Sequence, residues 1–146
     1  MHLSKKSEYA LRALVAIARE SRSWQIQELS RTENIPVKFL EQILLTLRRA
    51  GLLISKRGLG GGYVLRKAAS EISLCEVISI MDGPLAPVPC AADLPAEKCS
   101  CPDPATCPIR KVMTDFCKQM QSSLFSQTIE DLVRLSPRPD ALAFDI

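Results

Sequence analysis

Cysteine is the residue type in this chain with the widest capacity for chemistry. The 146 residues include six cysteines but a single histidine, His2. Four of the cysteines fall in one proline-rich stretch, at Cys90, Cys99, Cys101 and Cys107. Clustered thiolates are ligands for soft metal ions and for iron–sulfur clusters. Because the C-x2–4-C pairs common in zinc sites are missing, we expect these four residues to hold an iron–sulfur cluster, with zinc as the alternative.

The same thiols could instead form reversible disulfides or hold no cofactor at all. The N-terminus lacks the apolar segment of a signal peptide, and no apolar run approaches the ~20 residues of a membrane span. We therefore expect a cytoplasmic protein without membrane contact, in which metal or redox roles are more usual than structural disulfides. Cys75 and Cys117 fall in helical segments, where we expect Cys75 in the core and Cys117 in the core or at a dimer interface.

A second candidate for chemistry is the glycine-rich stretch KRGLGGGYVL, residues 56–65. A phosphate-binding loop needs a helix after its glycines, whereas YVL is typical of a strand. Tyr63 also stands where a dinucleotide fingerprint has its third glycine, and no Walker lysine follows. The stretch therefore predicts the tip of a β-hairpin.

Catalytic combinations of residues are not evident. A Ser-His-Asp set would have to use His2 at the frayed N-terminus, and a cysteine nucleophile would lack any better basic partner. We therefore predict that the protein is not an enzyme.

Charge is distributed unevenly along the chain. Residues 1–70 contain 13 lysines and arginines against 5 acidic residues, whereas residues 71–146 contain 6 against 11. A basic half indicates a polyanion partner, with nucleic acid the leading candidate. An unevenly charged, solvated surface is the alternative.

The elements of the basic half follow from hydrophobic periodicity and turn residues. They are a helix at 4–20, a short helix at 25–31, a turn at 32–34, a helix from Pro36 to Gly51, and strands at 52–55 and 63–65. This order is that of a winged helix–turn–helix, whose third helix enters the major groove of duplex DNA while the hairpin lies against the backbone or minor groove.

The second half predicts helices on both sides of the cysteine stretch. Ser73 and Glu76 indicate a capping box at the start of a helix that ends at Gly83. Pro108 opens a long helix, which a break at 126–128 separates from a short last helix. The apolar stripe of the long helix is Ile109, Val112, Met113, Phe116, Met120 and Leu124.

The expected fold class is mostly α with a small β-hairpin wing. Its parts are a winged helix DNA-binding domain at 1–83, a Pro/Cys-rich cluster-binding loop at 84–107, a dimerisation helix with a short last helix at 108–135, and a flexible tail at 136–146.

Candidate DNA contacts follow from the same periodicity. The inward stripe of the third helix is Leu40, Ile43, Leu44 and Leu47. The opposite face carries Lys38, Glu41, Gln42, Leu45 and Arg49. Gln can pair with adenine, Glu with cytosine, and Lys with guanine or phosphate, whereas an ordinary solvated face is the alternative. In the hairpin, Lys56 and Arg57 supply charge, and Gly60 and Gly61 let the backbone approach the duplex.

Four segments together resemble one protein family. LSKKSEYALRAL near the N-terminus, FLEQILLTLRRAGLL, KRGLGGGYVL and the trailing CPIRKV resemble the IscR/NsrR/CymR group of bacterial transcription factors, the Rrf-two family. The resemblance covers about residues 1–135 and implies a homodimer whose DNA binding is often gated by an iron–sulfur cluster. Lys38, Glu41 and Gln42 match the family's recognition-helix positions, and Arg57 matches its wing arginine.

The cysteines match the family only in part. Members commonly have three cysteines separated by five residues, a spacing that Cys101 and Cys107 keep, but the expected first position is Pro95. Cys90 is the substitute that the resemblance suggests, with Cys99 a competitor or fourth ligand. One branch uses a histidine where Arg110 stands. Another uses an acid from the partner subunit, at the position of Glu8.

We therefore expect a homodimeric, sequence-specific transcription regulator that binds double-stranded DNA at a near-palindromic operator. Its control would come from an iron–sulfur cluster or from the redox or metal state of the cysteines. The alternative is a winged helix module that contacts proteins and carries a structural zinc loop.

Overall fold

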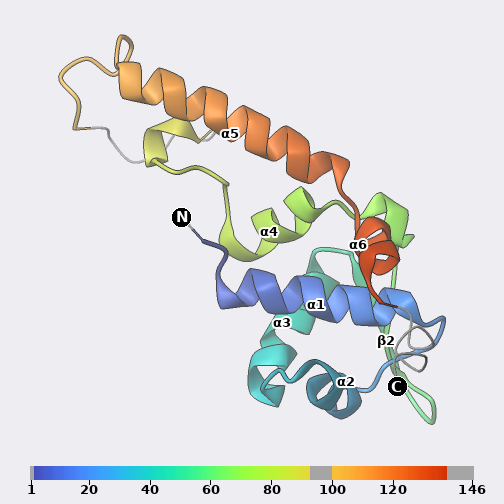
Figure 1. Ribbon diagram of the computed structural model, residues 1–146. Helices are drawn as coiled ribbons and strands as arrows, with labels where there is room; N and C mark the ends of the chain where they lie inside the picture. Colours follow the sequence, from blue (N-terminus) through green and yellow to red (C-terminus); the bar gives the residue numbers. More distant parts are fainter. Residues whose placement is uncertain (1, 93–99, 138–146) are drawn as a thin grey trace, which may run out of the picture.

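The computed structural model describes residues 2–92 and 100–137, so Cys99 and most of the expected C-terminal tail lie outside the described residues. Figure 1 shows a helical head, a β-hairpin, and a long helix along the opposite side of the molecule. The helices and strands are α1 (Lys5–Arg19), α2 (Ile26–Glu33), α3 (Val37–Arg49), β1 (Leu53–Lys56), β2 (Gly62–Leu65), α4 (Leu74–Asp82), α5 (Pro108–Ser126) and α6 (Ile129–Leu135). This arrangement confirms the predicted fold class.

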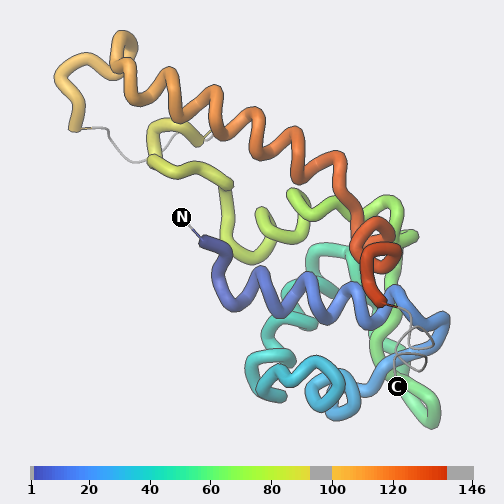
Figure 2. Tube along the Cα trace, viewed as in Figure 1, coloured from blue at the N-terminus to red at the C-terminus, as the bar shows by residue number. Residues whose placement is uncertain are grey.

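Helix α1 is the scaffold on which the head is built. Ser4 caps it by accepting a hydrogen bond from the Ser7 amide at 3.1 Å. The helix contacts α2, α3, α4, α6 and β2, and Figure 2 shows the course of the chain around it. Its inner face is lined by small and aliphatic side chains, which allow the neighbouring helices to approach closely: Ala10, Ala13, Leu14 and Ile17.

The connection between α2 and α3 sets the angle of the third helix. Asn34 ends α2 in the left-handed conformation, with φ 52° and ψ 51°, as the sequence predicts. The predicted turn is too wide, however, because Thr32 and Glu33 still belong to α2. The Arg12 guanidinium of α1 donates to the Glu33 carbonyl and pairs with its carboxylate at 3.5 Å, which holds this last turn of α2 in place.

The hairpin is a two-stranded antiparallel sheet that is anchored to the head by its backbone. Strand residues pair from Leu53 with Leu65 to Lys56 with Gly62. Trp24 and Tyr63 exchange backbone hydrogen bonds of 3.0 and 2.8 Å. Any Cβ at position 62, where φ is +146°, would overlap the Trp24 carbonyl, so only glycine fits there. The first strand begins one residue later than predicted, because the Leu52 amide closes the end of α3 by donating to the Leu47 carbonyl at 3.0 Å.

Two helix starts in the second half show how capping is achieved. At α4 the Ser73 hydroxyl accepts from the Glu76 amide at 3.1 Å, but the Glu76 carboxylate pairs with Lys67 at 3.0 Å instead of returning to Ser73. At α6 the reciprocal box forms between Thr128 and Asp131, with bonds of 3.2 and 2.8 Å. The predicted break before the last helix is therefore confirmed. Of the predicted capping box at α4, only the hydrogen bond that Ser73 accepts is present.

Helix α5 leaves the head and α6 returns to it. Backbone bonds from Leu74 to the Gln127 carbonyl and from Ile129 to the Ile72 carbonyl fasten the junction between α5 and α6 to the start of α4. Ile72 and Ile129 are completely buried there. The stretch before α5 is not wholly irregular as predicted, since a short 3-10 helix at Pro89–Ala91 packs against α5. None of the helices within the described ranges is long and apolar enough to cross a membrane.

Candidate nucleic-acid interface and cysteine loop

Helix α3 presents a polar face that is fixed by its apolar one. Leu40, Leu44 and Leu47 are completely buried, and Ile43 is 2% exposed. Because residues three and four apart share a face of a helix, the opposite side must point to solvent. The residues that the sequence selects for DNA contact all lie exposed on it: Lys38, Glu41, Gln42 and Arg49.

The wing adds unpaired positive charge. Lys56, Arg57 and Gly60 are exposed. No ion pair within the described ranges involves Lys38, Lys56 or Arg57, so these charges are available to an anionic partner. Gly61 differs from the expectation, because a Cβ there would lie 2.5 Å from the Lys56 carbonyl oxygen. Its position inside the turn gives it a structural role in the hairpin.

The cysteine loop brings two of the candidate ligands together. The Sγ atoms of Cys101 and Cys107 lie 3.8 Å apart. A tetrahedral metal with metal–sulfur bonds of about 2.3 Å spaces its sulfurs by about 3.8 Å, whereas a disulfide needs about 2.05 Å. The separation matches that of two thiolates on one metal, and it is equally that of a hydrogen bond between two thiols.

Polar contacts of the backbone organise the loop, and the sequence did not reveal them. Asp103 accepts from the Thr106 hydroxyl at 2.7 Å and the Ala105 amide at 3.1 Å, and these hydrogen bonds hold its pKa below the usual value. Arg110 donates to the carbonyls of Cys90 and Pro104, at 3.2 and 3.3 Å. One branch of the resembled family has a histidine ligand at the position of Arg110. In this chain the Arg110 side chain instead connects the segment at Cys90 to the segment at Pro104.

The other predicted ligands are not gathered at this pair. Cys99 lies outside the described residues. Across residues 2–92 and 100–137, no three cysteine, histidine or acidic side chains are grouped closely enough to hold a metal, so Cys90 does not complete a site with the Cys101–Cys107 pair. Glu8, which is expected to act from a partner subunit, pairs within its own chain with Lys5 at 2.7 Å and Arg12 at 3.7 Å, and the hydrogen bond from Lys5 lowers its pKa.

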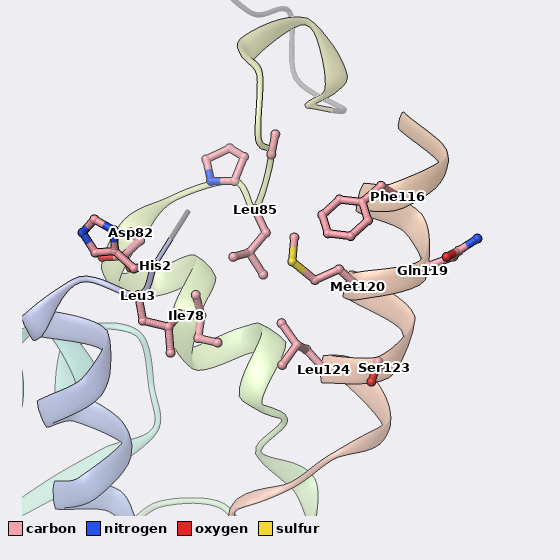
Figure 3. A pocket seen from close by; sticks show the side chains of 12 residues that line it. His2, Leu3, Ile78, Asp82, Leu85, Phe116, Gln119, Met120, Ser123 and Leu124 are labelled. Carbon is pink, nitrogen blue, oxygen red and sulfur yellow. The ribbon is translucent and has the colours of Figure 1, made fainter. Parts of the chain in front are cut away.

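Helix α5 exposes much of its predicted apolar stripe. Ile109, Val112 and Phe116 are 63%, 60% and 43% exposed, whereas Cys117 on the inner side is 2% exposed. Between α5, α4 and the N-terminus lies an open groove of about 680 Å³. Figure 3 shows Phe116, Met120 and other apolar side chains directed into it.

A polar junction ties the N-terminus to the end of α4. Asp82 accepts hydrogen bonds from the Ser4 amide at 3.2 Å, from the Ser4 hydroxyl and from the Ser7 hydroxyl at 2.7 Å. Burial opposes the charged form, but the bonds from Ser4 and Ser7 outweigh it and hold the pKa of Asp82 below its ordinary value of 3.8. The junction, which we call the Ser4–Ser7–Asp82 junction, fastens α1 to the residue from which the cysteine loop departs.

These features define a class of protein. A helical head with an outward-facing third helix, an anchored basic hairpin and a long C-terminal helix make a winged helix–turn–helix DNA-binding regulator. The chain belongs to the Rrf2 family, described as iron-dependent transcriptional regulators, whose pattern matches residues 3–135. This confirms the Rrf-two resemblance, and because the family consists of regulators it also confirms that the protein is not an enzyme.

Individual relatives agree with the family. The chain is 39% identical over 137 residues to a protein named as an rrf2-like HTH-type transcriptional regulator of Rhodobacter capsulatus, covering 90% of this chain and 91% of the relative. It is 32% identical over 136 residues to the HTH-type transcriptional regulator IscR of Xenorhabdus nematophila, covering 92% and 80%. The structure of CymR, the global cysteine regulator of B. subtilis, aligns with a TM-score of 0.77 at 28% identity, covering 94% and 99%.

The Ser4–Ser7–Asp82 junction predicts a particular pH dependence of stability. A carboxyl whose pKa is lowered on folding stabilises the protein above its unfolded pKa and loses that contribution as the pH falls through the folded pKa. Asp82→Ala should therefore lower the free energy of unfolding at pH 7, and its difference from the wild type should shrink below about pH 4. Urea unfolding of the variant and the wild type, at fixed protein concentration and at several pH values, measures the free energy of unfolding and its pH dependence. Asp115→Ala, an exposed aspartate on α5, is the matched control; a difference for Asp82→Ala that stayed constant with pH would contradict the assignment.

Proposed function

We propose that this regulator acts as a homodimer that reads a near-palindromic operator and is gated by a cofactor on its cysteine loop. The observation that carries the DNA-reading part is the exposed face of α3, whose Lys38, Glu41 and Gln42 stand above a fully buried stripe. Such a face can enter the major groove while the basic wing lies along the backbone or minor groove. A protein with this partner would work in the cytoplasm.

The residues of the interface divide by role. Gln42 and Glu41 offer amide and carboxylate groups that can pair with base edges. Lys38, Lys56, Arg57 and Arg49 supply charge for phosphates, which fixes register without reading sequence. Gly60 has no side chain of its own, so the backbone at this position can approach the duplex closely.

Gln42 provides the test of base reading. Loss of a bidentate amide contact costs about 1–3 kcal/mol of discrimination, so Gln42→Ala should bind a selected operator roughly tenfold or more weakly while non-specific binding changes little. Fluorescence anisotropy at several stated salt concentrations, with operator and scrambled duplexes, measures both affinities. Gln27→Ala, on the surface of α2, is the control variant. Equal losses on both duplexes would show that Gln42 does not read bases.

A second copy of the chain is the proposed occupant of the apolar side of α5. Two such helices paired about a two-fold axis would cover Ile109, Val112 and Phe116 in both subunits at once. The same axis would place two α3 helices on successive turns of one face of the DNA, which is why the operator should be near-palindromic.

A charge on this stripe should separate the subunits. An aspartate at position 116 would be buried without a partner in the paired helices, so Phe116→Asp should shift the protein from dimer to monomer and weaken operator binding by a factor of ten or more. Analytical ultracentrifugation measures the mass. Ile54→Asp makes the same change at a residue that is 44% exposed in the wing, and it should remain dimeric. A dimeric Phe116→Asp variant would exclude this interface.

Two of the proposed cofactor ligands in the cysteine loop have supporting geometry. Cys101 and Cys107 have the spacing of two thiolate ligands, and Cys90, Cys99 and Glu8 of a partner subunit are the proposed sources of the rest. When bound, an iron–sulfur cluster supplies a redox-active charged group; zinc is the alternative occupant. The description of the family as iron-dependent favours iron.

The attachment points of the loop support the proposed gating of the DNA-binding head. It departs from the Ser4–Ser7–Asp82 junction and ends at the first turn of α5. Ordering or releasing the loop would bias the position of α1 and α5 relative to each other. A tenfold change in DNA affinity needs only about 1.4 kcal/mol of differential binding to the two states.

Removal of one thiol tests the site. Cys101→Ser should lose most of the bound metal, because a hydroxyl is a poor ligand for soft metals, while Cys75→Ser on α4 should retain it. Protein purified without oxygen should be assayed for iron, sulfide, zinc and visible absorption. A brown protein with iron and sulfide supports the cluster, and a colourless zinc protein supports the alternative. Equal metal content in the Cys101→Ser and wild-type proteins would contradict a site at this pair.

A further inference from the structure

The tip of the wing carries an apolar side chain that the fold does not use. Leu59 is 108% exposed, compared with 77% for Leu135, the next most exposed large apolar side chain within the described ranges. A single exposed leucine has no meaning by itself. Its position therefore has to supply the argument.

Leu59 stands at the outermost point of a defined turn. The Gly61 amide donates to the Gly58 carbonyl at 3.0 Å, which closes a four-residue turn around Leu59 and Gly60. Gly60 has φ +75° at the third position, as a type II turn requires. The second position of this turn accepts most residues, so the turn itself creates no need for leucine.

The turn is held to the head at two places. The Ser23 hydroxyl donates to the Gly60 carbonyl, and Trp24 exchanges two backbone bonds with Tyr63. Figure 1 shows the hairpin projecting on the side of the molecule that carries α2, away from α5. Leu59 therefore projects from a turn whose backbone is fixed to the head of the protein.

The neighbours of Leu59 indicate which partner fits. Lys56 and Arg57 lie exposed beside it and form no ion pair within the described residues. An apolar side chain flanked by cations is complementary to a groove that has anionic edges and a floor able to contact apolar groups. The DNA minor groove has this character, with phosphates on both edges and base edges and sugars between them.

We propose that Leu59 enters the minor groove beside the half-site and selects against G·C pairs beneath the wing. The inference rests on the proposed DNA-binding function and adds a specificity-determining residue to it. Guanine alone places an amino group, N2, in the minor groove. An apolar side chain that covers this group removes its water without offering an acceptor, which carries a cost that A·T pairs avoid.

The test uses the full-length protein and a duplex recovered from a random pool by selection with the wild type. The base pair beneath the wing, located by footprinting, is made A·T, G·C or inosine·C, the last of which lacks the N2 amino group. Wild type should bind the A·T and inosine·C duplexes within about threefold of each other and the G·C duplex about tenfold more weakly. Leu59→Ala should lose this discrimination and bind the A·T duplex about tenfold more weakly.

Salt dependence and two further variants separate the explanations. Leu59→Ala should leave the slope of log affinity against log salt unchanged, whereas Arg57→Ala should reduce it by about one. Leu59→Met keeps an apolar side chain and should keep the discrimination. Because the Leu59 side chain is fully exposed among the residues that the structure describes, Leu59→Ala should unfold in urea at the wild-type midpoint.

Two results would overturn the inference while leaving DNA binding intact. One is binding of Leu59→Ala within twofold of the wild type, and the other is undiminished discrimination against G·C in that variant. Failure of the wild type to bind any selected duplex would overturn the proposed function, and this inference with it.

Discussion

Burial of one side of α3 is the constraint on which the rest of the structure depends. Leu40, Leu44 and Leu47 are completely buried, and each contributes about 2 kcal/mol through the apolar surface removed from water. Rotation of the helix about its axis would expose them together. The polar side therefore has a fixed orientation without any specific contact of its own, and the wing inherits this orientation because the Leu52 amide closes the end of the helix.

The molecule separates two kinds of interaction in space. The head carries exposed cations on α3 and the hairpin, whose attraction to an anionic partner is long-ranged and weakens with salt. Helix α5 carries an apolar surface that acts only on contact and is little affected by salt. A change in ionic strength would therefore act on DNA binding more than on the proposed pairing of two copies through α5.

The sequence predicts those features that follow from local periodicity and turn chemistry. The buried stripe of α3, the left-handed Asn34 and the hairpin around its glycines all depend on residues within a few positions of one another. Contacts across long separations were not predictable in this way. Arg12 contacts the carbonyl and carboxylate of Glu33 at the end of α2, and Asp82 accepts a hydrogen bond from Ser4, 78 positions away.

The cysteine loop and the wing tip show the same division at the candidate site. The resemblance to the family's cysteine spacing suggests that Cys101 and Cys107 act together, and their sulfurs lie 3.8 Å apart. That Arg110 holds two carbonyls of the loop depends on how the chain returns on itself, which no short pattern encodes. The exposure of Leu59 likewise appears only once the turn is built, because leucine in a sequence is ordinarily evidence of a core.

The exposed apolar side of α5 also has a consequence for the stability of the protein at low concentration. Apolar side chains that are 60% or more exposed, as at Ile109 and Val112, are a liability for a lone subunit, which would tend to adhere to other unfolded or partly folded chains. If a second copy covers them, mass action links folding to abundance, and dilution erodes the native state. The amount synthesised by the cell would then set both the occupancy of the operator and the lifetime of the polypeptide.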